Sequence, residues 1–515
     1  MRGAVAAGHP LTAEAGARVL REGGNAVDAC IAAAAMSWVA ESPLTGPGAG
    51  GFMLVHRASD DSTRVLDHFV SVPGLGLRRR DPLEMDSVAV AFTPESSQMF
   101  RIGAASCAVP GAVAGLGEAH RLFGSLPWRV LLEPAIRRAR EGVVVTKPQA
   151  YLHAILDVIL RHTQGGRAIY GEEQRLLAGD RLVMDDLART LEQLAELGAA
   201  DFYRGELAQR ISSHLLEQGG AITPRDLAEY RVIRRRPVRV SFLGHEFESN
   251  PPPSTGGILI GLGVRLLDRL GAGGTPGSAE AIALLVEIMR EQEAARDEVF
   301  SRDLYRGGLA RRLYDRRAVE AAVWRLRRRL PEAVRGTTHI SIVDGRGNAA
   351  SLTASTGSGS GVVVPGTGIQ LNNMLGEFDL VRTGRVPRPG VRFTSGMAPT
   401  LVLREGRPRL VIGSAGSLRL RGAIFQVVVN VVGHGLAVDE AIDRPRVHLE
   451  EPHVHCEGGH DPAELDRLEA RGYELVRWRR RNLFFGGVSA VEFRADGALT
   501  AAGDPRRGGD GVVVE

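Results

Sequence analysis

Thr337 is a candidate for a hydroxyl nucleophile that is activated by a base within the same residue. The segment reads Gly336-Thr337-Thr338-His339, and the alternating apolar residues that follow predict a β-strand over 337–343. A hydroxyl is a weak nucleophile until a base takes its proton. A free α-amine on the same residue, with a reference pKa of about 7.7–8.0, can be that base. Such a residue must become a new N-terminus at the start of a strand, and the preceding Gly336 tolerates the unusual backbone geometry this demands.

Taken alone, this junction also has a plain structural explanation, because threonine favours strands. The periodicity around it predicts both helices and strands. The expected helices are Leu11–Arg21, a second one capped by Asn25 and ending near Val39, Val113–Leu122, Leu131–Glu141, Leu182–Leu197 and Ile258–Leu270. The expected strands are Phe52–His56, a hairpin of Thr337–Val343 and Ala349–Ser355, and Arg409–Ile412, which leads through a loop to a helix, Leu420–Val432.

The chain resembles the γ-glutamyltransferase (glutathione hydrolase) family over nearly its whole length. The matching segments are Gly24–Ala29, Gly48–Met53, Val109–Gly111, Phe202–Gly205, Asp226–Tyr230, Pro251–Gly257, Thr337–Asp344, Leu371–Asn373, Met397–Thr400 and Gly413–Arg419. The resemblance implies an α+β fold, the four-layer αββα sandwich of N-terminal-nucleophile hydrolases. It also implies a precursor cut into a large subunit, 1–336, and a small subunit, 337–515. The two would form one domain as a heterodimer, and pairing of such heterodimers stays open.

The same resemblance assigns chemistry to particular residues. Thr337 would attack a side-chain amide carbonyl, and the resulting acyl-enzyme would pass its acyl group to water or to an amine. Backbone N–H groups of Gly416 and Ser417 would stabilise the oxyanion, where the family has two glycines. Ser355 stands where the family has a second threonine beside the nucleophile, and it keeps the hydroxyl.

Several substrate-binding positions depart from the family pattern. Phe69 stands where the family has the arginine that holds the substrate α-carboxylate, and phenylalanine cannot replace a guanidinium. Met374 aligns with a Glu or Gln that helps to hold the α-amine, whereas Glu377 and Ser395 are kept. We therefore expect an amidase or acylase with a small-molecule amide substrate less zwitterionic than glutathione. A γ-glutamyl substrate stays open, because Arg392 is a candidate for the carboxylate contact.

Composition indicates a globular protein, with 44% hydrophobic and 24% charged residues. The net charge of +4 comes from arginines interleaved with acids, so we expect no nucleic-acid partner. The N-terminus has no apolar region of signal-peptide length, and the most apolar stretch, Ala29–Ala40, is too short to span a membrane, so we expect a cytoplasmic protein without a membrane partner. A non-catalytic, uncut relative that acts as a binding or scaffold protein is the alternative from another class.

Threonine chemistry of this kind needs no cofactor or metal, and we expect none. The loop Gly46–Gly51 fits G-x-G-x-x-G, but a helix precedes it and a strand follows, the reverse of a dinucleotide site. His453, His455 and Glu457 would share one face of a strand, which leaves a zinc site as an alternative. The neighbouring segment Asp443–His448 resembles ordinary family sequence, which favours a structural role for these side chains.

Overall fold

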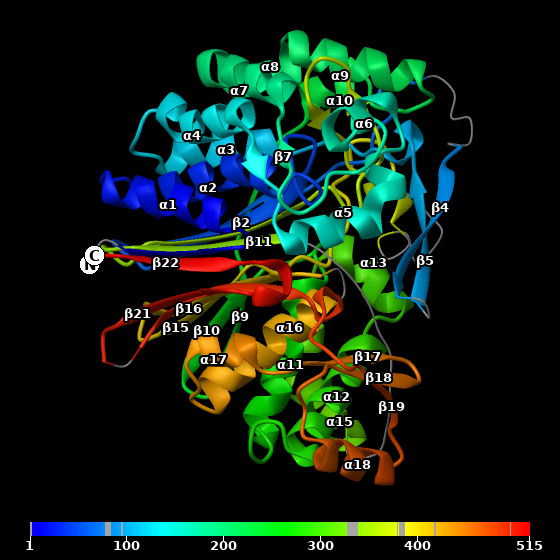
Figure 1. The fold of residues 1–515 in the computed structure, drawn as a ribbon. Coiled ribbons are helices and arrows are strands. Elements are labelled where there is room, and N and C mark those ends of the chain that lie inside the picture. The colour runs from blue at the N-terminus through cyan, green and yellow to red at the C-terminus, as the bar shows by residue number, and fades with distance from the viewer. Residues whose placement is uncertain are drawn as a thin grey trace.

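A computed structural model of the chain describes residues 3–77, 84–93, 96–326, 338–377, 380, 387–416, 419–494 and 496–515. It has a mixed helix-and-sheet fold in which two antiparallel sheets lie face to face (Figure 1). The seven-stranded sheet runs β22 (Asp510–Val514), β1 (Gly3–Ala7), β11 (Thr338–Asp344), β12 (Ala349–Ser355), β2 (Gly50–Arg57), β3 (Ser62–His68) and β8 (Ile233–Arg235). The six-stranded sheet runs β21 (Leu499–Gly503), β20 (Gly487–Phe493), β16 (Arg407–Ala415), β15 (Thr400–Arg404), β10 (His245–Ser249) and β9 (Val238–Phe242).

Helices cover the outer face of each sheet (Figure 1). Those over the seven-stranded sheet include α1 (Pro10–Arg21), α2 (Ala26–Ala40), α3 (Ala112–Phe123), α4 (Trp128–Glu141) and α7 (Asp185–Leu197). The same part of the chain adds α5 (Lys147–Leu160), α6 (Gln164–Tyr170), α8 (Asp201–Arg204), α9 (Glu206–Glu217) and α10 (Pro224–Glu229). Beyond the six-stranded sheet are α11 (Gly256–Leu270), α12 (Ala279–Ala294), α13 (Glu298–Arg306), α14 (Leu309–Leu313), α15 (Arg316–Leu326), α16 (Arg419–Val428), α17 (Val438–Asp443) and α18 (Pro462–Ala470).

Smaller sheets lie outside this stack. They are the hairpin β4–β5 (Asp86–Thr93, Ser96–Ile102), the pairs β6–β7 (Val143–Val144, Arg181–Leu182) and β13–β14 (Val363–Val364, Ile369–Gln370), and the three-stranded sheet β17–β18–β19 (Val447–Glu450, His453–Cys456, Glu474–Arg477). Within the described ranges, no helix combines the length and the apolar character that crossing a membrane requires.

The alternation of residues along β11 explains its position between helices and a second sheet. Ile340 and Ile342 pack into the core beneath the helices, whereas Val343 packs into the core between the sheets. Successive side chains of a strand point to opposite faces, so both faces of β11 are covered. The predicted hairpin is confirmed, with β11 paired to β12 in antiparallel register from Thr338–Ala354 to Val343–Ala349.

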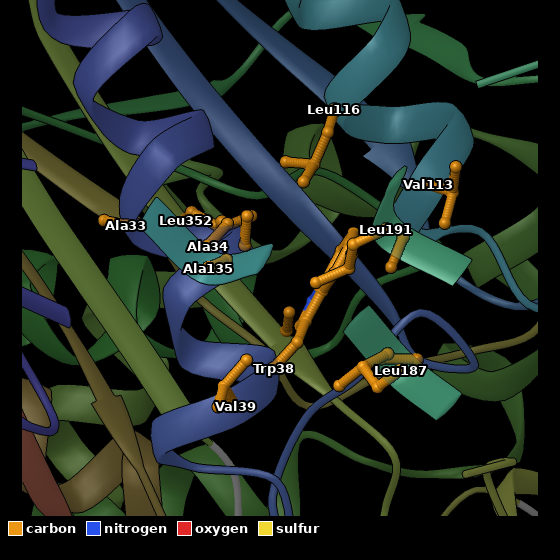
Figure 2. Packing of buried hydrophobic residues seen from close by; sticks show 14 of the residues in the cluster. Ala33, Ala34, Trp38, Val39, Val113, Leu116, Ala135, Leu187, Leu191 and Leu352 are labelled. Atoms are coloured by element: carbon orange, nitrogen blue, oxygen red, sulfur yellow. The ribbon is translucent and has the colours of Figure 1, made fainter. Parts of the chain in front are cut away.

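The first core lies between the seven-stranded sheet and its helices. Every residue of α2 is buried, and the helix begins with a capping box in which Asn25 and Asp28 exchange side-chain and backbone hydrogen bonds. Figure 2 shows Trp38 of α2 packed near Leu191 of α7, with Leu352 of β12 in the same cluster. An alanine-rich helix suits this place because its small side chains let sheet and helices approach closely.

Three predicted elements have different bounds in the structure. The helix expected from Leu182 begins at Asp185, because Arg181 and Leu182 pair with Val143 and Val144 as a short strand. The strand expected to stop at Ile412 continues to Ala415, because Gly413–Ala415 pair with Gly487–Ser489 of β20. The helix after it ends at Val428 and continues as a π-helical turn, Val429–Gly433.

Candidate active site

The β11–β12 hairpin begins one residue after the predicted cleavage junction in the sequence. Thr338 is the first residue of β11 and pairs with Ala354, so Ser355 lies at the end of β12 nearest the junction. Ser355 itself pairs with Gly50 of β2 and is buried. Three predicted site residues lie outside the described part of the chain: Gly336, Thr337 and Ser417.

Ser355 and Glu377 are joined through the turn that follows β12. The Oγ atom of Ser355 accepts a hydrogen bond from the Gly357 N–H at 2.8 Å. Ser358 donates its backbone N–H to Asn373 Oδ1 at 2.9 Å and its hydroxyl to Glu377 Oε1 at 3.1 Å. Gly357 has a φ of +72°, and a Cβ there would lie 2.2 Å from Asn373 Oδ1. The turn therefore requires glycine, and it holds two predicted site residues in one hydrogen-bonded unit.

Gly416 lies where β16 leads toward α16. Its φ of +133° favours glycine, and a Cβ there would lie 2.6 Å from the Cα of Gly486. Its carbonyl accepts a hydrogen bond from the Arg419 N–H at 3.0 Å, at the first residue of α16. A loop that enters a helix presents unpaired backbone N–H groups, which are suited to a developing negative charge. The strand–loop–helix setting predicted for this glycine is confirmed.

A polar seam formed by His339, Ser341 and Thr353 joins β11 to the second sheet. The His339 ring lies between Thr353 Oγ1, 2.8 Å from Nδ1, and Ser341 Oγ, 2.9 Å from Nε2. Burial lowers the pKa of His339 to about 3, so the ring is neutral at neutral pH. Ser341 donates to the Ser489 carbonyl of β20 at 3.0 Å. A Cβ at Gly413 would lie 2.3 Å from His339 Cε1, so β16 fits directly against this ring.

Phe69 and Met374 lie in one apolar cluster between the sheets. The Phe69 side chain is 1% exposed and stacks on Phe52, with ring centroids 5.5 Å apart. Met374, Phe393 and Met397 are buried in the same cluster. An unpaired guanidinium among these groups would be strongly unfavourable. The structure thus has a buried apolar side chain at the position where the resemblance implies carboxylate binding.

Ser395 lies in the loop between these apolar residues and α11. Its Oγ atom accepts a hydrogen bond from the Met397 N–H at 3.1 Å. Its carbonyl accepts from the Thr255 N–H at 2.7 Å and from the Thr255 hydroxyl at 3.0 Å. The Pro251–Gly257 turn is therefore tied to the loop that carries Ser395, which is how this turn contributes to the site.

The Arg392 guanidinium binds the backbone around Phe69. Its Nε atom lies 3.2 Å from Asp67 Oδ1, and Nη1 donates to the Tyr230 hydroxyl at 2.7 Å and to the Phe69 carbonyl. Nη2 donates to the Asp67 carbonyl at 3.3 Å and to the Arg231 carbonyl. The guanidinium also stacks over the Tyr230 ring, 4.7 Å from its centroid. Each of its three nitrogens contacts a protein group, so this geometry does not support the alternative in which Arg392 grips a substrate carboxylate.

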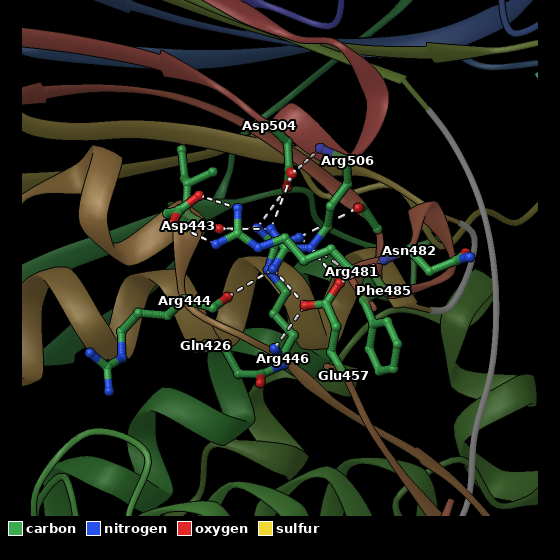
Figure 3. Close-up of polar contacts among 12 residues, drawn as sticks. Gln426, Asp443, Arg444, Arg446, Glu457, Arg481, Asn482, Phe485, Asp504 and Arg506 are labelled. Atoms are coloured by element: carbon green, nitrogen blue, oxygen red, sulfur yellow. Dashed lines mark hydrogen bonds and ion pairs between the residues drawn. The ribbon is translucent and has the colours of Figure 1, made fainter. Parts of the chain in front are cut away.

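A buried ion network joins Arg446, Asp504, Arg506 and Glu457 (Figure 3). Arg446 Nη2 lies 2.6 Å from Asp504, and Arg506 pairs with Glu457 at 2.5 Å and with Asp504 at 3.1 Å. All four side chains are buried. Arg446 Nη1 also donates to the Gly486 carbonyl at 3.4 Å, and Gly486 is the residue against which the Gly416 loop packs. Sequence reasoning missed this network, although Asp-Arg-Pro-Arg at 443–446 and Asp-Pro-Arg at 504–506 were signals for it.

The histidine-rich strand β18 is occupied with protein contacts. His455 Nδ1 accepts from Trp478 Nε1 at 3.1 Å, and its Nε2 lies 3.1 Å from Glu450. Glu457 binds Arg506 instead of pointing toward the histidines. Within the described ranges, no group of three or more His, Cys, Asp or Glu side chains could hold a metal ion. The zinc alternative for this strand therefore gains no support.

The comparisons place the chain in a family of N-terminal-nucleophile hydrolases. Residues 12–514 match the gamma-glutamyltranspeptidase family, and the chain belongs to it. The acylase ACY 1 proenzyme of Pseudomonas sp. (strain SE83) is 33% identical over 532 residues, covering 100% of this chain and 94% of the relative. The glutathione hydrolase proenzyme of Escherichia coli (strain K12) is 31% identical over 538 residues, covering 98% and 90%. Cephalosporin acylase from Bacillus halodurans, a solved structure, has a TM-score of 0.85 at 25% identity, covering 100% of this chain and 96% of its own.

Proposed function

We propose that the protein is a self-cleaving amide hydrolase or acyl transferase with Thr337 as its nucleophile. Cleavage after Gly336 frees the Thr337 amine, which takes the proton of its own hydroxyl. The oxygen then attacks the amide carbonyl, the C–N bond breaks, and the amine departs with a proton. Water or a second amine resolves the threonine ester. The N–H groups of Gly416 and Ser417 hold the oxyanion, and Ser355 supplies a supporting hydroxyl.

The arrangement of strands supports the proposed cut. Two face-to-face sheets with helices outside them support the four-layer αββα sandwich that we propose. In the seven-stranded sheet, β1 from the 1–336 half lies between β22 and β11 from the 337–515 half, and β12 lies beside β2. The halves therefore share a hydrogen-bonded sheet and would stay together as a heterodimer within one domain. Processed proenzymes among the relatives agree with this arrangement.

The substrate preference we propose is for an acyl group without a free amino-acid head. One observation at the end of β3 supports this preference. The Phe69 side chain is buried against Phe52, and the Arg392 guanidinium is already bound to protein groups, among them Asp67 and Tyr230. A carboxylate placed there would find no guanidinium fork. Similarity to an acylase proenzyme and to a cephalosporin acylase supports this substrate preference.

A γ-glutamyl substrate is the second candidate. Glu377 and Ser395 are kept at positions that the family uses for the glutamyl head; Glu377 accepts a hydrogen bond from Ser358 and Ser395 from the Met397 N–H. The glutathione hydrolase proenzyme is nearly as similar to this chain as the acylase proenzyme. Gly357 and Met374, however, supply no polar side-chain partner for an α-amine.

Three p-nitroanilides distinguish the two candidates. The γ-glutamyl and glutaryl compounds differ only in the α-amine, and the glutaryl and pentanoyl compounds differ in the terminal carboxylate. We expect kcat/KM for at least one compound without the amine to exceed that for γ-glutamyl by about tenfold or more, since one buried unmatched charge costs over 1.4 kcal/mol. Free glutamate should not compete. Preferred turnover of the γ-glutamyl compound, inhibited by glutamate, would contradict the acylase preference.

A further inference from the structure

A groove of about 700 Å³ lies in the helical layer outside the seven-stranded sheet (Figure 1). Its walls come from α3, from the turn between α7 and α8, and from the segment that joins α10 to β8. The part of the candidate active site that the structure describes contributes no residue to this lining, so the groove is a separate cavity. A volume of this size is in the range that holds a small organic molecule.

Short side chains leave the groove open. Gly117 of α3 and Ala199 of the α7–α8 turn lie so close that a Cβ at Gly117 would be 2.6 Å from the Ala199 Cβ. A Cβ at Gly198, by contrast, would meet no atom within 4 Å. The walls elsewhere include further alanines, at positions 114, 195, 200 and 228. Because these residues have almost no side chain, the space between the elements stays unfilled.

A stacked tyrosine pair, Tyr203 and Tyr230, lines the groove. Their ring centroids are 5.4 Å apart with an interplanar angle of 18°. The Tyr203 hydroxyl donates to the Pro110 carbonyl at 3.1 Å, and the Tyr230 hydroxyl donates to the Phe69 carbonyl at 2.7 Å. These bonds fix both rings before a ligand arrives, which lowers the entropic cost of binding.

The groove also offers apolar surface to a ligand. Leu197 lines it with 62% of its surface exposed, and the partly buried Val232 lines it from the side of β8. An apolar group placed against these side chains and the tyrosine pair would leave water, which favours binding.

Arg204 and Arg231 are exposed cations of the groove, and neither pairs with a carboxylate of the described residues. Arg231 Nη1 donates to the Ala228 carbonyl at 2.9 Å and to the Tyr230 carbonyl at 2.7 Å. Its Nε and Nη2 atoms donate to no group in the part of the chain that the structure describes. A guanidinium is a planar fork of donors that matches a carboxylate, so both arginines are suited to an anionic ligand.

The carboxylates of the lining do not balance these cations. Glu118 lies 2.8 Å from Arg121 and 2.6 Å from Arg234, so two arginines already share its charge. Glu196 is the other carboxylate of the lining, and it is exposed. The groove therefore carries excess positive charge around an apolar interior, which complements a ligand with a negative group on an apolar body.

We propose that this groove binds a small organic carboxylate. The apolar body of the ligand lies against the tyrosine pair and Leu197, and its carboxylate lies at Arg204 and Arg231. Glu196 opposes the ligand through repulsion of like charges. The site is independent of the amide chemistry proposed above, because it uses none of the residues to which that chemistry is assigned.

The test compares naphthalene-2-acetate with naphthalene-2-acetamide, which have the same apolar body and differ in charge. Isothermal titration calorimetry on the full chain gives Kd for each. We expect wild type to bind the acetate about fivefold or more tightly than the amide, as charged hydrogen bonds at exposed arginines allow. The preference should shrink when NaCl is raised from about 50 mM to about 500 mM, because salt screens exposed charges.

Three variants place this preference in the groove. The double variant Arg204→Met with Arg231→Met keeps both stems without their charges and should reduce the preference to within about twofold. Glu196→Gln removes the opposing charge and should increase the preference. Arg189→Met is the matched control, because Arg189 is an exposed arginine of α7 outside the lining, and it should leave the preference unchanged.

Equal Kd values for the two compounds on wild type, or a preference that survives in the double variant, would overturn the inference. If the double variant does not fold, Glu196→Gln decides the question: an acetate preference that does not increase overturns the proposal. Self-cleavage and p-nitroanilide hydrolysis report on the proposed function separately. Their absence contradicts that function and leaves the groove's binding intact, whereas their presence without an acetate preference contradicts only the groove.

Discussion

The Nε atom of Arg392 lies 3.2 Å from the carboxylate of Asp67, and together these residues fix the backbone on both sides of Phe69. Asp67 Oδ1 accepts the Phe69 N–H at 3.1 Å, while Arg392 donates to the Phe69 carbonyl. Arg392 thus acts on the Phe69 position through contacts with the backbone. We therefore expect Arg392 to position the apolar side chain of Phe69.

Replacing Arg392 with methionine should therefore lower activity on all acyl groups alike. The change leaves the buried Asp67 with Arg235 as its remaining ion-pair partner, and we expect a loss of about 3–5 kcal/mol in the free energy of unfolding. Urea denaturation and kcat/KM for the glutaryl and pentanoyl anilides check this. Arg235→Met is the control, since Arg235 pairs with Asp67 from a partly exposed position. A loss confined to the carboxylate-bearing anilide would show that Arg392 binds substrate.

Gly413→Ala should strain the seam between the sheets. The new methyl group would lie 2.3 Å from His339 Cε1, and both β16 and β11 are held by neighbouring strands. Overpacking of this kind costs about 1–3 kcal/mol. Gly46→Ala is the matched control, because the nearest atom to a Cβ there is 4.0 Å away. Thermal melting should show a lower Tm for Gly413→Ala and little change for Gly46→Ala; equal values would contradict the close fit.

Local periodicity made parts of the fold predictable. The alternation in 337–355 and the Asp344-Gly345 turn predicted the hairpin, whose second strand matches the expected bounds. The Asn25 cap predicted the start of α2. The helix predicted at Val113–Leu122 is present although it contains glycines. Close packing explains Gly115, since a Cβ there would lie 2.1 Å from the His68 ring.

Long-range pairing was not predictable in the same way. A sequence pattern states which face of a strand is apolar but not which strand lies beside it. The placement of β1 between β11 and β22 therefore required the structure. The same holds for the Arg392–Tyr230 contact, between residues 162 positions apart, and for the Arg446–Asp504 pair. For the site, the resemblance predicted that Gly416 and Ser355 belong to it. The groups that Arg392 binds depend on its packing, which the sequence does not state.

Arg446→Met should damage both stability and catalysis. It leaves Asp504 and Glu457 in a buried network with one cation fewer, which costs about 3–5 kcal/mol, and it removes a donor from the Gly486 carbonyl. Because Gly486 supports the Gly416 loop, kcat of the folded fraction should fall more than KM changes. Arg481→Met breaks an exposed pair with Asp443 and should cost at most about 1 kcal/mol. Similar effects in both variants would contradict the supporting role of the network.

Glu248 should make the fold less stable as the pH rises from about 4 to about 7. This carboxyl on β10 is fully buried, and burial raises its pKa to about 7 although Arg239 Nε lies 2.6 Å away. Its folded pKa lies above the unfolded value of about 4.3, so its contribution is most favourable below that value. The contribution is lost as pH rises toward 7, on the order of 2–3 kcal/mol.

Glu248→Gln should therefore raise Tm at pH 8 and leave it nearly unchanged near pH 4.5. Thermal melts at several pH values measure the difference between the variant and wild type. Glu246→Gln, at a half-exposed neighbour on the same strand, should show no such pH dependence. A lower Tm for Glu248→Gln at pH 8 would mean that the ion pair with Arg239 outweighs the cost of burial.

The most direct test of the central claim is a denaturing gel with intact mass on wild type, Thr337→Ala and the control Thr338→Ala. Scaling 55.2 kDa by 336/515 predicts fragments of about 36 kDa and about 19 kDa for wild type and Thr338→Ala. Thr337→Ala should remain a single chain of 55.2 kDa. Cleavage in Thr337→Ala would contradict Thr337 as the self-cleaving nucleophile, and an intact chain in all three proteins would favour a non-catalytic relative that acts by binding.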